Sequence, residues 1–229
     1  MTRPPTGLAY EREQVGAVPG MLRTRWRGVD FSLRYAIETG EDTRRSTAGI
    51  GAIVDVAVLE TALSVPTAEI GLLECGARTD LASVLASTLI SAVHDVDEMV
   101  WAHRVGAVPL TPVEAVIPAR RLDEGLTRAE RLAGYAARTV LLPPGSRPTD
   151  RMLTEAGCYG LGVCVGDTAE RCTSLIAPIP MRVHRVSPEW WLFVENMYRE
   201  HLVTTGDPRA QTSSLNQFSI SARGFSLGR

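Results

Sequence analysis

Two carboxylates stand inside apolar stretches of the chain, at positions where a buried strand tolerates no unpaired charge. Asp55 lies in residues 50–59 (IGAIVDVAVL), and Glu74 lies in residues 68–76 (AEIGLLECG). Because burying an unpaired carboxylate costs several kcal/mol, each acid needs a solvent-exposed strand end, a charged partner or a metal ion. Adjacent strands lie about 4.8 Å apart, so carboxylates at their facing ends lie close together. Such a pair can hold one Mg²⁺ ion, which polarises a phosphate and activates water.

Arginine side chains supply the positive charge that a phosphate-processing site needs. Arg78 follows Glu74 closely, and Arg44 and Arg45 form a pair suited to gripping phosphate. These residues also have a purely structural interpretation, in which Asp55 pairs with one of the three arginines and Glu74 lies near a helix N-terminus. A separate structural interpretation leaves Arg44 and Arg45 exposed and without a partner. The sequence leaves both interpretations open.

A second group of arginines lies further along the chain and is interleaved with acids at helical spacing. Arg128 and Arg131 recur on one helical face beside these acids, which predicts surface ion pairs. Arg120 and Arg121, like Arg44 and Arg45, either grip phosphate or are exposed without a partner. The residues are Arg120, Arg121, Arg128 and Arg131, with Asp123, Glu124 and Glu130.

The composition excludes several kinds of site. The chain has no lysine among its 24 basic residues and a net charge of -2. No Schiff-base lysine or P-loop lysine is therefore present, and no overall field attracts nucleic acid. An arginine-rich, lysine-free composition is typical of a high-GC genome, actinobacterial or phage, and selection against lysine-directed tagging is the alternative reason.

The location of the protein also follows from composition. Residues 1–20 are polar and rich in proline, with no apolar leader, and no apolar run is long enough to span a membrane. We therefore expect a cytoplasmic protein with reduced cysteines. The spacing of these cysteines does not fit a zinc site; they are Cys75, Cys158, Cys164 and Cys172.

Hydrophobic periodicity predicts three consecutive strands in the first part of the chain. Residues 29–38 (VDFSLRYAIE) alternate apolar and polar side chains, which is typical of a half-buried strand. A turn at 40–43 leads to strands at 50–59 and 68–75. Strands joined by short links form an antiparallel meander.

Helical spacing begins after the third strand. A leucine stripe from Thr79 to His94 predicts a helix, and three prolines in 104–119 predict an irregular insertion. The remaining chain alternates helices and strands, which together with the meander gives an α/β (α+β) fold with a mixed sheet. The expected elements are helix 123–138, strand 139–142, helix 149–156, strand 159–165 and helix 188–201.

The same patterns predict the domain organisation. Residues 1–28 form an N-terminal arm, and residues 29–205 form a single domain with an insertion near 104–138. Residues 206–229 form a polar C-terminal tail. The helix at 188–201 begins with Ser187 as its cap and contains adjacent tryptophans that point about 100° apart, so one of them could face a protein partner or a second copy of the chain.

The predicted order of three strands, a helix and a strand resembles the core of the restriction-endonuclease-like fold, the PD-(D/E)XK superfamily. In that family an acid on the second strand is followed by Glu-x-Lys on the third. Asp55 and Glu74-Cys75-Gly76 occupy these places, and the later strand ending in proline is also similar. The resemblance covers about residues 29–167. It implies a nuclease with Asp55 and Glu74 as Mg²⁺ ligands.

The chain departs from this pattern at one place, because Gly76 stands where the family has lysine. Arg78 is the nearest replacement, although arginine does not deprotonate. The resemblance therefore implies a nucleic-acid-associated protein with a degraded or weakly active phosphodiesterase site, in which Arg44, Arg45 and Arg78 contact nucleic acid. The alternative is a non-enzymatic assembly subunit that docks through the 188–201 helix and the tail.

Overall fold

A six-stranded mixed sheet forms the larger part of the protein in the computed structural model, which describes residues 18–67, 70–72, 87–96 and 99–211. Its strand order is β1-β2-β6-β7-β8-β9. β1, β2 and β6 are antiparallel, β6, β7 and β8 are parallel, and β9 is antiparallel to β8. The strands are β1 (Val18–Trp26), β2 (Val29–Ile37), β6 (Leu110–Pro118), β7 (Ala137–Leu142), β8 (Gly162–Gly166) and β9 (Cys172–Ile176).

The first hairpin follows from local sequence. Phe31, Leu33 and Tyr35 of β2 are buried, whereas the intervening side chains are partly exposed, which confirms the predicted alternation. Arg27 and Gly28 connect β1 to β2 with positive φ angles of 47° and 75°. Two residues with positive φ give the twist that a tight hairpin requires.

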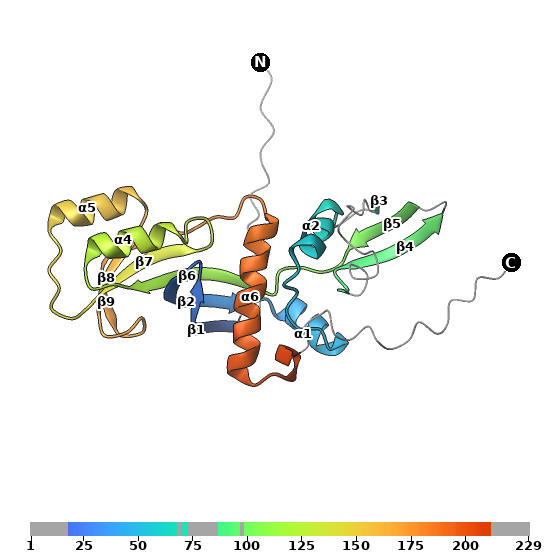
Figure 1. The fold of residues 1–229 in the computed structure, drawn as a ribbon, viewed down its shortest axis with the longest axis horizontal. Coiled ribbons are helices and arrows are strands. Elements are labelled where there is room, and N and C mark those ends of the chain that lie inside the picture. The colour runs from blue at the N-terminus through green and yellow to red at the C-terminus, as the bar shows by residue number, and fades with distance from the viewer. Residues whose placement is uncertain (1–17, 68–69, 73–86, 97–98, 212–229) are drawn as a thin grey trace, which may run out of the picture.

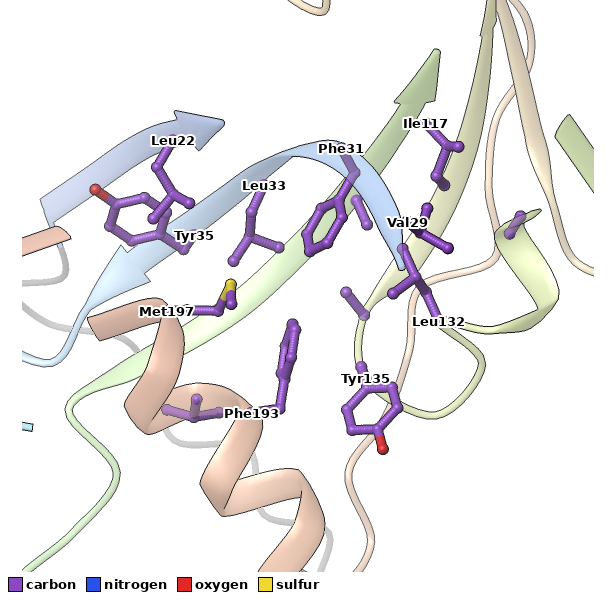
Figure 2. Close-up of a cluster of buried hydrophobic side chains, with 14 of the residues drawn as sticks. Leu22, Val29, Phe31, Leu33, Tyr35, Ile117, Leu132, Tyr135, Phe193 and Met197 are labelled. Carbon is purple, nitrogen blue, oxygen red and sulfur yellow. The ribbon is translucent and has the colours of Figure 1, made fainter. Parts of the chain in front are cut away.

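Three helices, labelled in Figure 1, share a hydrophobic core with one face of this sheet. They are α4 (Leu122–Glu130), α5 (Asp150–Cys158) and α6 (Pro188–Thr205). Figure 2 shows Phe193 and Met197 of α6 pointing towards Leu33 and Phe31 of β2. Gly125 of α4 lies so close to β7 that an added Cβ would stand 2.3 Å from Val140 Cγ1, so this helix requires glycine there.

A smaller unit is inserted between β2 and β6. It contains a three-stranded antiparallel sheet of order β3-β5-β4 and a separate core. In Figure 1 it lies on the opposite side of α6 from α4 and α5. Its elements are α1 (Thr39–Ala48), α2 (Val56–Ser64), β3 (Gly71–Leu72), β4 (Ile90–Val96) and β5 (Met99–Arg104).

Helix α6 joins the two units. Ser187 caps it, since its hydroxyl accepts a hydrogen bond from the Trp190 backbone nitrogen at 3.2 Å. Trp190 is buried in the core of the large sheet, and Trp191 is buried in the core of the inserted unit. The two adjacent tryptophans therefore fill two different cores, and neither faces a partner.

The predicted strand at 50–59 is wrong. Residues 50–54 belong to no helix or strand, and α2 begins at Val56. Asp55 therefore stands at a helix terminus and not on a strand. The predicted turn at 40–43 is also wrong, because these residues belong to α1. Of the third predicted strand, the structure describes residues 70–72, and β3 lies in the smaller sheet.

Two further predictions are corrected. The helix predicted to reach His94 lies partly outside the described residues, and its end is strand β4. The insertion predicted near 104–138 instead supplies β6, α4 and the start of β7 to the main sheet, while β1 occupies part of the predicted arm. The final helix, the helix near 149–156 and the strands near 139–142 and 159–165 are confirmed within a few residues.

Among the described residues, no helix is both long enough and apolar enough to cross a membrane.

Candidate functional site

Asp55 caps helix α2. Its Oδ1 atom accepts hydrogen bonds from the backbone nitrogens of Ala57 and Val58, at 2.9 and 3.4 Å. These amides begin the helix and have no carbonyl partner within it. The carboxylate thus satisfies them and lies favourably at the positive end of the helix dipole. This capping explains how an acid is tolerated in an apolar stretch.

Replacing Asp55 by alanine is expected to lower the free energy of unfolding by about 1 kcal/mol, the usual cost of a lost cap. Chemical denaturation measures this change. Asp55→Asn is the matched control, because an asparagine side chain still offers an oxygen to the same amides and stability should be nearly retained. If the asparagine variant is as unstable as the alanine variant, the carboxylate charge matters more than the cap.

The other predicted metal ligand, Glu74, and the predicted cation Arg78 lie outside the described residues. Within residues 18–67, 70–72, 87–96 and 99–211, no three His, Cys, Asp or Glu side chains are close enough to hold a metal ion. A shared Mg²⁺ site at Asp55 and Glu74 therefore stays a prediction.

Arg44 and Arg45 lie on helix α1 and form ion pairs instead of an open phosphate grip. Arg45 is fully buried and makes two hydrogen bonds to Glu195 of α6, at 2.8 and 2.7 Å. Glu41 accepts hydrogen bonds from both arginines. Arg45 therefore has no surface for nucleic acid, which corrects that prediction, and Arg44 is largely committed to Glu41.

The electrostatics of this network keep Glu41 and Arg45 charged. Burial alone would raise the pKa of Glu41, but hydrogen bonds and charge from Arg44 and Arg45 lower it below the usual glutamate value. Burial opposes the charge of Arg45, yet Glu195 and Glu41 raise the pKa of its guanidinium. The network fastens α1 to α6 and has a structural role.

A second polar cluster crosses the middle of the main sheet, on the face opposite the core helices. Arg34 of β2 and Glu114 of β6 are directly opposite each other and form an ion pair at 2.8 Å. Thr139 of β7 donates a hydrogen bond to Glu114, and Arg34 donates one to the Ala169 carbonyl oxygen at 2.6 Å. At this place β2 therefore carries a cation, Arg34, and β6 carries a carboxylate, Glu114.

A cleft of about 460 Å³ lies at the carboxyl ends of the parallel strands β6, β7 and β8. In sheets with parallel strands, ligands commonly bind at this edge, and the volume suits a small ligand or part of a polymer. The residues that line it are Pro118, Ala119, Arg120, Glu124, Arg128, Leu141, Leu142, Pro143, Pro144, Gly166 and Asp167.

The charged side chains that line the cleft differ in whether they form ion pairs and hydrogen bonds within the protein. Arg128 donates to the Pro118 carbonyl oxygen at 2.7 Å and pairs with Glu124 at 3.5 Å. Arg120 and Asp167 are exposed and make no ion pair or side-chain hydrogen bond within the part of the chain that the structure describes. They remain free to contact a ligand.

The surface ion pairs predicted for Arg128 and Arg131 are confirmed for Arg128. Arg121 pairs with Asp123 at 2.7 Å, and Arg128 pairs with Glu124. The sequence pattern did not separate Arg120 from its neighbours, and it gave no signal for Asp167. Both become candidates only when β6 and β8 are placed two strands apart in one sheet.

Comparisons with protein-family models, curated proteins and solved structures found no match for this chain.

Proposed function

We propose that this protein binds nucleic acid without hydrolysing it, and that the cleft at the carboxyl ends of β6, β7 and β8 contacts the phosphate backbone. The observation that carries the proposal is the exposed, unpaired Arg120 on the wall of this cleft. An arginine that forms no ion pair within the described chain can make bidentate hydrogen bonds to phosphate. Arg128 adds a second positive charge, which Glu124 partly neutralises.

The element order of the main sheet supports a restriction-endonuclease-like relationship built from other strands than those predicted. β1, β2 and β6 form an antiparallel meander, and α4 then leads to β7 parallel to β6. This is the order of three strands, a helix and a strand that the resemblance implies. The inserted unit interrupts it between the second and third strands.

The facing residues of the second and third strands favour binding over cleavage. Hydrolysis by two-strand metal ligation needs carboxylates on both strands. The facing residue on β2 is instead Arg34, which forms an ion pair with Glu114. The negative charge of Glu114 is therefore already neutralised by a neighbouring side chain. Val116 occupies the position two residues after Glu114, where the family pattern has lysine.

The inserted unit is a less suitable surface for a phosphate backbone. Residues 39–108 contain four arginines and ten acidic residues. Because this negative balance disfavours phosphate, we assign the phosphate contact to the cleft and not to the inserted unit.

The test is binding of fluorescent single-stranded and double-stranded DNA and RNA, followed by anisotropy at several salt concentrations. Arg120→Ala is expected to weaken binding about tenfold, since hydrogen bonds to charged groups are worth about 1.5–3 kcal/mol. The variant should also lower the slope of log affinity against log salt by about 0.7–0.9 for each lost phosphate contact.

Arg151→Ala is the matched control, because Arg151 is exposed on α5 and does not line the cleft. Both variants remove one positive charge, so a merely global electrostatic effect would weaken binding equally. Wild-type protein that binds none of the four nucleic acids would refute the proposed function. Binding that survives Arg120→Ala would refute only the role of the cleft. Cleavage products with Mg²⁺ or Mn²⁺ would refute the absence of hydrolysis.

A further inference from the structure

Two cysteines lie next to each other on the outer hairpin of the main sheet. Cys164 is on β8 and Cys172 is on β9, and their Cα partners across the hairpin are Ser174 and Gly166. The two cysteines are therefore diagonal neighbours whose side chains share one face of the sheet. The register is irregular between Val163 and Cys164, and such irregularities increase the local twist of the hairpin.

The two thiols belong to the same small apolar cluster. Cys164 is 3% exposed within it, and Cys172 is partly buried against it. Val116, Leu141 and Ala169 of the β8–β9 loop are the other buried members of the cluster. The Cys172 thiol also donates a hydrogen bond to the Ala169 carbonyl oxygen at 3.5 Å. Neither sulfur lies on an open surface, and both are held in place by neighbours.

The thiols differ in reactivity. Burial raises the pKa of the Cys164 thiol to about 12, and its hydrogen bond with Cys172 acts in the same direction. Cys164 therefore stays protonated at neutral pH. Cys172 is the more accessible of the two, so a small oxidant reaches it first.

We propose that Cys164 and Cys172 form a reversible redox pair that a peroxide oxidises to a disulfide. The Cys172 thiolate attacks one oxygen of hydrogen peroxide, which breaks the O–O bond, gives a sulfenic acid and releases hydroxide. The Cys164 sulfur then attacks the Cys172 sulfur. Hydroxide leaves from that sulfur and takes the Cys164 proton, so the S–S bond forms with loss of water. Peroxide is reduced, and the two thiols together lose two hydrogens.

This modification would fix the loop that joins β8 to β9. The loop begins at Asp167, which lines the cleft, and Arg34 already holds its Ala169 carbonyl oxygen at 2.6 Å. A bond between the strands on either side of the loop restricts its remaining freedom. Formation of the disulfide does not depend on nucleic-acid binding, and the test below does not measure nucleic-acid binding.

The test uses a variant in which Cys75 and Cys158 are both serine, so that only the proposed pair remains. After peroxide treatment and denaturation, the expected intact mass is lower by two hydrogens, and neither thiol reacts with N-ethylmaleimide. Dithiothreitol should restore both reactive thiols. Trypsin cleaves after Arg171, between the two cysteines, so a disulfide must hold peptides 152–171 and 172–182 together until it is reduced.

Adding Cys172→Ser to that background is the control, and its single remaining thiol should still react with maleimide after peroxide. The wild-type protein provides a second measurement that does not depend on any variant. Peptide 152–171 also contains Cys158, so fragment ions of the linked tryptic peptides must place the bond at Cys164. Two thiols that stay reactive after peroxide has oxidised the exposed Cys158 of the wild type would overturn the proposal. Oxygen added to Cys172 with no link to Cys164 would do the same.

Discussion

Replacing Glu195 by alanine is expected to lower the free energy of unfolding by about 3–5 kcal/mol, the usual cost of removing one partner of a buried ion pair. Glu195 is fully buried and accepts two hydrogen bonds from Arg45, one from the Trp191 indole nitrogen and one from the Ile53 backbone nitrogen. Its loss leaves the Arg45 guanidinium buried with only Glu41 as a charged partner. Urea denaturation measures the change.

The matched control is Glu200→Ala on the same helix. The Glu200 side chain is 42% exposed, and its nearest cation, Arg199, is 4.0 Å away. Exposed pairs of this kind contribute little, so the expected change is within about 0.5 kcal/mol. Equal losses for Glu195→Ala and Glu200→Ala would contradict the assignment of Arg45 to the core.

A double variant tests whether the ion pair itself stabilises the fold. The alternative is that each charge is needed only because its buried partner is present. Replacing Arg45 by methionine and Glu195 by leucine together removes both charges and keeps apolar volume. Buried ion pairs are often replaceable in this way at little cost. The double variant should therefore be more stable than Glu195→Ala alone, and a still lower stability would show that the hydrogen bonds to Trp191 and Ile53 dominate.

The sequence predicts an element correctly where the decisive interactions are local. The alternation of β2 and the Ser187-Pro188 start of α6 lie within a few residues of the structure they specify. The apolar run at 50–59 predicts a strand because its valines and isoleucines favour strands. The capping of α2 by Asp55 outweighs that preference, and Leu59 and Ala62, three residues apart, are buried on one helix face.

Long-range pairing could not be predicted in the same way. β2 pairs with β6 after an insertion of some seventy residues, so Arg34 meets Glu114 across 80 positions of sequence. Arg45 meets Glu195 across 150 positions. The charges of Arg44 and Arg45 are visible in the sequence, but their partners are not. An arginine pair in a polar stretch therefore suggests a phosphate-binding site, and only the fold shows that carboxylates pair with it.

The predicted three-strand meander illustrates both effects. Its order exists in the structure, but β1, β2 and β6 form it, because the inserted unit takes up the residues that follow β2. β1 was missed since Pro19 and Gly20 disfavour a strand interior. Gly20 is required there, because an added Cβ would stand 2.5 Å from the Tyr35 hydroxyl.

Replacing Phe193 by alanine should also lower the free energy of unfolding, by about 3–5 kcal/mol. Phe193 is 1% exposed, and its ring lies 4.9 Å from that of Tyr135 and 5.5 Å from that of Trp26. Figure 2 shows the side chain pointing from α6 into the core of the main sheet. Alanine leaves a cavity between the helix and the sheet that these neighbours only partly fill. Thermal and urea unfolding measure the loss.

The result separates the two roles that the apolar sequence of α6 suggests. A docking helix would lose partner binding and keep its stability when an aromatic side chain is removed, whereas a core helix loses stability itself. Val203→Ala is the control, because Val203 lies on the same helix and is 58% exposed, and its expected change is within about 0.5 kcal/mol. If Phe193→Ala unfolds like the wild type, α6 is not the element that joins the two cores, and docking through this helix becomes the better interpretation.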